Sequence, residues 1–107
     1  IPRAPGAEVT IEANPDTLTA EKAAVLAAFG VTRVSLGVQS FQPAELAAVN
    51  RSFPPGAHQR AIDAVARAGF PQFNIDLIYG LPGQTRQSWR ESLVAAADTP
   101  ATSLFLY

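Results

Sequence analysis

The sequence predicts an α/β fold in which parallel strands alternate with helices, and two observations lead to this prediction. First, strand-like and helix-like segments follow one another in the order β-α-β-α-α-β-α-β, which is typical of parallel sheets with right-handed crossovers. Second, three of the strand-like segments carry aliphatic residues on one face and polar or small residues on the other.

The first half of the chain supplies two strands and two helices. Residues 8–13, EVTIEA, alternate and contain β-branched residues, which predicts a strand. After the break at Asn14-Pro15-Asp16, Thr17 or Thr19 can cap a helix over residues 19–29, which Gly30 ends. The remaining predictions here are a strand over residues 32–38 and a short helix, PAELAAVN, beginning at Pro43.

The second half repeats this alternation after a Pro-Pro-Gly loop. Residues 58–68 predict a helix that Gly69 stops, and residues 72–79 predict the third strand. The GLPGQT loop then leads to a helix over residues 86–97 with a threonine as its N-cap candidate. The final SLFLY predicts a fourth strand.

Composition limits the classes of function. With 8 basic and 9 acidic residues among 107, the chain offers no electrostatic reason to bind nucleic acid or an anionic membrane. No apolar run reaches the roughly 20 residues that span a bilayer, and no signal peptide opens the chain, so we expect a cytoplasmic setting. The chain has no cysteine and a single histidine, His58, so we expect no disulfide and no metal site within it.

The polar faces of the three strands are the main functional signal. Strands of parallel sheets are usually buried on both faces and hydrophobic throughout, and these are not. A hydrogen-bonded network inside the protein explains any one such polar residue as well as a ligand does. Recurrence on three strands, near their C-terminal ends, favours a ligand-binding interior and therefore a barrel or partial barrel. The polar or small residues are Thr10 and Glu12, then Arg33, Ser35, Gly37 and Gln39, then Asn74 and Asp76.

Asp76 raises the sharpest question, because an ionised carboxylate is costly to bury without partners. It stands between the aliphatic residues of NIDLI, so something should face it: a ligand, or a structural partner on a neighbouring strand or loop. Gly37 similarly indicates either the close approach of a ligand or a β-bulge.

Other chemistry is poorly supported. Neither Ser35 nor Ser40 lies in a GxSxG motif, which argues against a hydrolytic triad, and the GLPG loop lacks the GK[ST] of a phosphate loop. We expect His58, at the start of a helix, to be solvated or to cap that helix. No catalytic residue is assigned.

Four blocks of sequence resemble one family. TIEANP at 10–15, RVSLGVQSF at 33–41, NR at 50–51 and NIDLIYGLPGQT at 74–85 are similar to the radical S-adenosylmethionine (SAM) family of oxygen-independent coproporphyrinogen III oxidase, which includes the HemW-like haem chaperones. The resemblance runs from about residue 8 to the end. It implies a partial (β/α)6 barrel, a TIM-like fold, of which this chain would form about strands 3–6.

The resemblance also implies what lies outside the chain. The family's CxxxCxxC motif, which binds the [4Fe-4S] cluster, has no match here. Residues 1–107 are therefore expected to be one segment of a radical SAM core domain, without the N-terminal cluster-binding part and the C-terminal domain. The parent protein would be a radical SAM oxidoreductase, and the isolated segment would be inactive.

Residue by residue, the resemblance implies a SAM site. Glu12 matches the family's SAM-contacting glutamate, and Gln39, Arg51 and Asp76 match positions that contact SAM, including a second SAM molecule in the oxidase. A surface role is the alternative for Arg51. In the family, an electron from the cluster splits SAM, and the resulting radical leads to loss of CO2 from propionates of coproporphyrinogen III in haem biosynthesis.

The sequence is compatible with three functions. An oxidase would take a porphyrinogen substrate and an electron donor such as flavodoxin or ferredoxin, whereas a chaperone would bind haem. EANP, SLGVQSF and GLPGQT are slightly closer to HemW-type members, but NR at 50–51 favours the oxidase. A radical SAM methyltransferase of the same branch is the third. Open strand edges at EVTIEA and SLFLY predict that the isolated segment self-associates.

Overall fold

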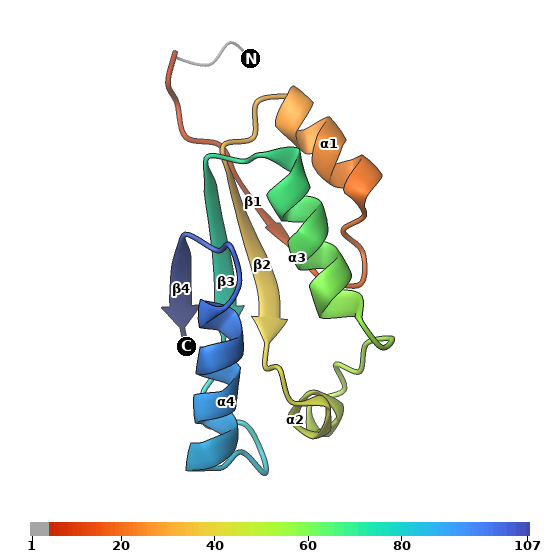
Figure 1. Ribbon diagram of the computed structural model, residues 1–107, viewed down its shortest axis with the longest axis vertical. Coiled ribbons are helices and arrows are strands. Elements are labelled where there is room, and N and C mark those ends of the chain that lie inside the picture. Colours follow the sequence, from red (N-terminus) through yellow and green to blue (C-terminus); the bar gives the residue numbers. More distant parts are fainter. Residues whose placement is uncertain (1–4) are drawn as a thin grey trace.

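A four-stranded parallel sheet with strand order β1-β2-β3-β4 forms the centre of the computed structural model, which describes residues 5–107 (Figure 1). The strands are β1 (Thr10–Ala13), β2 (Arg33–Gln39), β3 (Gln72–Leu77) and β4 (Ser103–Leu106). The helices are α1 (Ala20–Ala28), α2 (Pro43–Ala48), α3 (Ala57–Ala68) and α4 (Arg86–Ala97). The predicted element order and the parallel sheet are confirmed, with ends that differ by at most two residues.

Local sequence signals account for the helix ends. Of the two threonines that could cap α1, Thr19 does so, because its hydroxyl oxygen accepts a hydrogen bond from the Lys22 amide at 3.1 Å. Thr85 and Ser88 form a reciprocal capping box at the start of α4, with N–O distances of 3.0 and 2.9 Å. Gly69 ends α3 in the left-handed conformation, with a φ of 77°.

The aliphatic face of the sheet forms the core with the helices. Figure 1 shows α1, α3 and α4 on one side of the sheet, and their buried side chains belong to the same hydrophobic cluster as those of β2 and β3. This burial is the main favourable term that holds the layers together. Its most deeply buried members, each at most 1% exposed, are Ala23, Val34, Leu36, Val38, Ala61, Ile62, Val65, Ile75, Leu77 and Ala96.

The C-terminal ends of the strands point to the edge where α2 and the β3–α4 loop lie (Figure 1). Near this edge the pairing of β2 with β3 shifts, so that Leu36 pairs with Ile75 but Gln39 pairs with Leu77. Gln39 has a φ of 69°, a left-handed backbone conformation that residues other than glycine rarely adopt. The β-bulge alternative for Gly37 is therefore what the structure shows.

Within residues 5–107, no helix is long and apolar enough to cross a membrane.

The two outer strands of the sheet are β1 and β4, as the sequence predicted. Large apolar side chains are exposed at the β4 side: Leu106 is 49% exposed and Tyr107 is 62% exposed. An unpaired strand edge that carries exposed apolar residues readily pairs with another chain.

We predict that the isolated 107-residue chain self-associates through these edges, and that Leu106→Lys weakens the association because a charge opposes edge pairing. Val25→Lys is the matched control, since Val25 is a similarly exposed aliphatic residue, at 50%, on a helix and not on an edge strand. Sedimentation velocity over a concentration series measures both. A wild-type chain that stays monomeric at high concentration would contradict the prediction.

Candidate ligand-binding face

Asn74 organises the polar face of the sheet. Its side chain is fully buried, and its amide nitrogen donates hydrogen bonds to Ser35 Oγ and Asp76 Oδ1, both at 2.7 Å. Its side-chain oxygen accepts a hydrogen bond from Ser103 Oγ at 3.1 Å. Asn74 therefore joins β2, β3 and β4 through side chains alone, and every partner lies on the face opposite the helices.

Side chains of the sheet compensate the burial of the Asp76 carboxylate by hydrogen bonding to it. Besides the bond from Asn74, its Oδ2 accepts a hydrogen bond from Ser35 Oγ at 3.1 Å. The structural partner on a neighbouring strand, one of the two explanations open from the sequence, is thus present. A carboxylate has about four acceptor positions, and these bonds use two of them. Since Asp76 is also partly exposed, it can still accept hydrogen bonds from a ligand.

Arg33, the first residue of β2, extends across this face toward β4. Its guanidinium lies 4.7 Å from the centre of the Phe105 ring, an arrangement that favours cation–π attraction. Because Arg33 is on β2 and Phe105 is on β4, the arginine side chain passes over β3, which lies between them. It also lies 3.9 Å from the Glu8 carboxylate. Since Phe105 pairs with Asp76, the Arg33 side chain spans the face from the start of β2 to the level of Asp76.

Gln39 is at the C-terminal end of β2. Its amide nitrogen lies 3.0 Å from the point that a Cβ on Gly37 would occupy, and Ala13 O and Asn14 Oδ1 lie within 3.8 Å of that point. The absence of a side chain at Gly37 thus leaves room for the Gln39 amide beside the end of β1. The backbone oxygen of Gln39 accepts a hydrogen bond from Ile78 N at 2.9 Å, which ties the ends of β2 and β3 together.

Glu12 and Arg51 take no part in these side-chain hydrogen bonds. Glu12 pairs in register with Ser35, so it lies on the same polar face. Glu12 is exposed and lines a recess of about 370 Å³ at the open edge of β1. Arg51 is exposed in the segment after α2, where its backbone amide donates to Leu46 O at 2.8 Å. Within residues 5–107, the structure brings Glu12, Gln39 and Asp76 to the same sheet face and shows no hydrogen bond or ion pair between the Arg51 side chain and any of them.

Sequence reasoning missed a buried carboxylate, Glu45, at the same edge of the sheet. Glu45 is only 4% exposed and accepts hydrogen bonds from Ser40, Gln84 and Ser88. Its position next to a proline-initiated helix start gave no signal of burial. The polar residues that bind it are up to 43 positions away in the sequence, so no local pattern could have found it.

The prediction that His58 is solvated or caps a helix was wrong. Gly56 is the N-cap of α3, and the His58 ring packs against Phe41 and Phe53, with centroids 5.6 and 5.1 Å apart. Its Nε2 is buried and makes no hydrogen bond within residues 5–107. Burial lowers the pKa of His58 below its ordinary value of 6.5, because an imidazolium would lose its hydration there.

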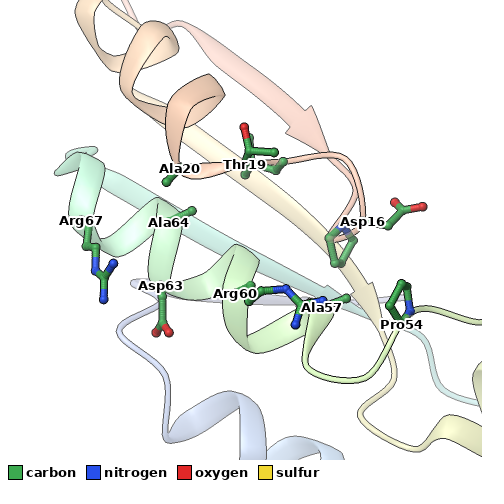
Figure 2. Close-up of a pocket in the computed structure, with 11 residues that line it drawn as sticks. Asp16, Thr19, Ala20, Pro54, Ala57, Arg60, Asp63, Ala64 and Arg67 are labelled. Carbon is green, nitrogen blue, oxygen red and sulfur yellow. The ribbon is translucent and has the colours of Figure 1, made fainter.

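A groove of about 500 Å³ lies elsewhere, between the β1–α1 loop and α3 (Figure 2). It is bordered by Asp16 and Pro54, and by Arg60, Asp63 and Arg67 along one side of α3. Arg60 already donates a hydrogen bond to Pro55 O at 3.0 Å. The groove is on the helical side of the sheet and contains none of the residues that the sequence assigned to a ligand.

The comparisons with known proteins agree with this architecture. The model of the radical SAM superfamily matches residues 2–96, and the chain belongs to that superfamily.

Within the superfamily, the chain is similar to two kinds of protein. It is 40% identical to the haem chaperone HemW of Mycobacterium tuberculosis over 97% of this chain and 27% of the relative. It is 45% identical to the oxygen-independent coproporphyrinogen III oxidase of Bradyrhizobium diazoefficiens over 88% of this chain and 22% of the relative. The chain thus spans about a quarter of the length of these relatives.

A solved structure confirms the predicted fold class. Coproporphyrinogen III oxidase (HemN) from Escherichia coli, described as a radical SAM enzyme, superposes with a TM-score of 0.83 and 34% identity. The match covers 94% of this chain and 24% of that protein. The four parallel strands and the helices between them are therefore part of a TIM-like barrel, as the sequence predicted.

We predict that Asn74→Ala lowers the free energy of unfolding by roughly 1–3 kcal/mol, because it removes a buried group that pairs with three side chains. Ser103→Ala is the control, since it removes only the donor to Asn74 Oδ1 and should cost less. Urea unfolding followed by circular dichroism measures both. Equal effects of the two substitutions would show that Asn74 does not organise this face.

We predict that the buried His58 makes the free energy of unfolding fall at acid pH. Because its folded-state pKa is lowered, the stabilisation is complete above pH 6.5 and is lost as the pH falls through the folded-state value. His58→Phe should remove the loss that begins as the pH falls below 6.5. Unfolding measured at several pH values tests this, together with an NMR titration of the wild-type imidazole. An unchanged pH profile in the variant would contradict the assignment.

Proposed function

We propose that the protein to which this chain belongs binds SAM on the polar face of the sheet and acts as an oxygen-independent coproporphyrinogen III oxidase-like enzyme. The observation that supports this most is the placement of Asp76. Its carboxylate is held by Ser35 and Asn74 at the end of β3, and it remains partly exposed on a face that no helix among the described residues covers. Ligands of α/β barrels bind at this end of the strands.

The side chains on this face suit the groups that SAM presents. Its ribose hydroxyls and its ammonium group can donate hydrogen bonds to the carboxylates of Asp76 and Glu12. The Gln39 amide can both donate and accept. The exposed Arg51 has a planar guanidinium that could bind the SAM carboxylate through two hydrogen bonds if α2 and the segment after it faced the ligand.

The iron–sulfur cluster would be held by residues outside this chain, which has no cysteine. We place residues 1–107 within the radical SAM core domain, with the cluster-binding part and a C-terminal domain elsewhere in the protein. When bound, SAM and the cluster supply the one-electron chemistry that removes a hydrogen atom from an unreactive carbon. The contribution of this chain is to bind and orient SAM and to exclude water from one wall of the barrel.

The similarity to coproporphyrinogen III oxidases supports a proposal for the substrate. A porphyrinogen whose propionates are decarboxylated would be the substrate, and an electron donor such as flavodoxin or ferredoxin would be a partner. A HemW-type haem chaperone is the second candidate, because 40% identity extends over 97% of the chain. Among the described residues, no observation favours a methyltransferase. We propose a cytoplasmic location for either function.

The test uses the full-length protein that contains this chain, reconstituted with iron and sulfide without oxygen. We expect 5′-deoxyadenosine and a decarboxylated porphyrin product to form together when SAM, a reductant and coproporphyrinogen III are added. Mass spectrometry follows both products. Deoxyadenosine without porphyrin turnover would favour the chaperone, and haem titration would then decide. No deoxyadenosine from a protein with an intact cluster would contradict the SAM site.

Variants locate the site on the sheet face. Asp76→Asn should weaken SAM binding by about tenfold or more, since a charge-assisted hydrogen bond becomes a neutral one. Gly37→Ala should also weaken binding, because the new Cβ would displace the Gln39 amide. Asp63→Asn is the matched control: Asp63 is an exposed aspartate on α3 that accepts a hydrogen bond from Gln59. An equal affinity of all three variants would place the SAM site elsewhere.

A further inference from the structure

Glu45 is a buried acid that the proposed chemistry does not use. It is the third residue of α2, and 96% of its surface is buried, since its exposed fraction is 4%. Oε1 accepts hydrogen bonds from Ser40 Oγ at 2.8 Å and from Gln84 Nε2 at 3.2 Å, and Oε2 accepts one from Ser88 Oγ at 2.5 Å. A buried carboxylate needs such partners, so this arrangement is specific to an acidic residue.

The carboxylate is ionised at neutral pH. Burial alone would raise the pKa of Glu45, but the hydrogen bonds from Ser88, Ser40 and Gln84 outweigh it and lower the pKa below its ordinary value of 4.5. The three donors therefore face a full negative charge, which makes each hydrogen bond stronger than a neutral one.

The three donors come from three different segments. Ser40 directly follows Gln39 at the end of β2, Gln84 is in the β3–α4 loop, and Ser88 is in the first turn of α4. Glu45 itself comes from α2, which Figure 1 shows beside this loop at the C-terminal edge of the sheet. One side chain thus connects four segments that are up to 43 residues apart in the sequence.

Gln84 extends the connection into the loop. Its side-chain oxygen accepts a hydrogen bond from Gly80 N at 2.7 Å, while its nitrogen also donates to Ile78 O at 3.2 Å. Ile78 N in turn donates to Gln39 O. A closed ring of contacts therefore runs from Gln39 through Ile78, Gln84 and Glu45 to Ser40, and back to Gln39 along the chain.

We propose that Glu45 is a positioning residue that holds the loop of residues 78–84 and the left-handed Gln39 in the arrangement that binds SAM. The inference rests on the proposed SAM site, because Gln39 and the strand that carries Asp76 are what the ring positions. Glu45 does not contact the ligand-binding face itself. It acts through Ser40 and Gln84, which fix the backbone on either side of the site.

The test measures loop order and SAM affinity separately in the full-length protein. Glu45→Ala should speed amide hydrogen exchange in residues 78–84 by about tenfold or more while leaving β3 protected, because the loop loses its charged acceptor. SAM affinity should fall by a similar factor. Glu45→Gln should have a smaller effect on both, since its oxygen can still accept from one or two of the donors.

Matched variants keep the outcome clear. Glu91→Gln is the control, because Glu91 is an exposed carboxylate on α4 that also accepts hydrogen bonds from two glutamines, Gln42 and Gln87. If Glu45→Ala does not fold, Glu45→Gln carries the test, because it replaces the charged acceptor by a neutral one and leaves the bonds of Gln84 to Gly80 N and Ile78 O in place. It should still speed exchange in the same residues relative to the control. Exchange in residues 78–84 equal to that of Glu91→Gln would overturn the proposal.

The two proposals fail in different ways. A wild-type protein that does not bind SAM would contradict the proposed function, and the exchange measurement would still show whether Glu45 holds the loop. Faster exchange in Glu45→Ala with unchanged SAM affinity would overturn the positioning role while leaving the SAM site intact.

Discussion

The side chain of Asn74 is the interaction on which the polar face of the sheet depends. It is buried, its partners lie on three strands, and all of its side-chain contacts are on the side away from the helices. Because this face satisfies its polar groups within the sheet, the aliphatic residues of β2 and β3 can point to the other face. The helices therefore pack on one side only, and the opposite side remains available to a ligand.

Two networks of polar side chains fix different parts of the site. The network on the sheet fixes the Asp76 carboxylate by side-chain hydrogen bonds, whereas the ring through Glu45 fixes the backbone beyond the strand ends. Arg33 extends from the start of β2 across the face to Phe105. Gln39 and Asp76, to which the family resemblance assigned SAM contacts, lie near the C-terminal ends of their strands, and Asp76 is partly exposed. Glu12 shares this face as the register partner of Ser35, whereas Arg51 is in the segment after α2. Neither side chain takes part in these networks, so their roles depend on the proposed function more than on observed contacts.

The sequence predicted those features whose causes are local. Alternation in EVTIEA and NIDLI, the threonine caps and the glycine stops are all set within a few residues, and the structure confirms the elements that they predict. The polar face was predictable for the same reason. The partners of Asp76, the burial of Glu45 and the aromatic contacts of His58 were not, because each joins residues that are distant along the chain. Asp76 and Ser35 are 41 positions apart, and only the register of β2 with β3 brings them together.

A crystal structure of the full-length protein with bound SAM would test the central claim most directly. The account predicts SAM density against the polar face at the C-terminal ends of β1–β3, with an oxygen of Asp76 and the Gln39 amide within hydrogen-bond distance of the ligand. SAM bound only in the groove between the β1–α1 loop and α3, or anywhere else that leaves Asp76 and Gln39 without a ligand contact, would contradict it.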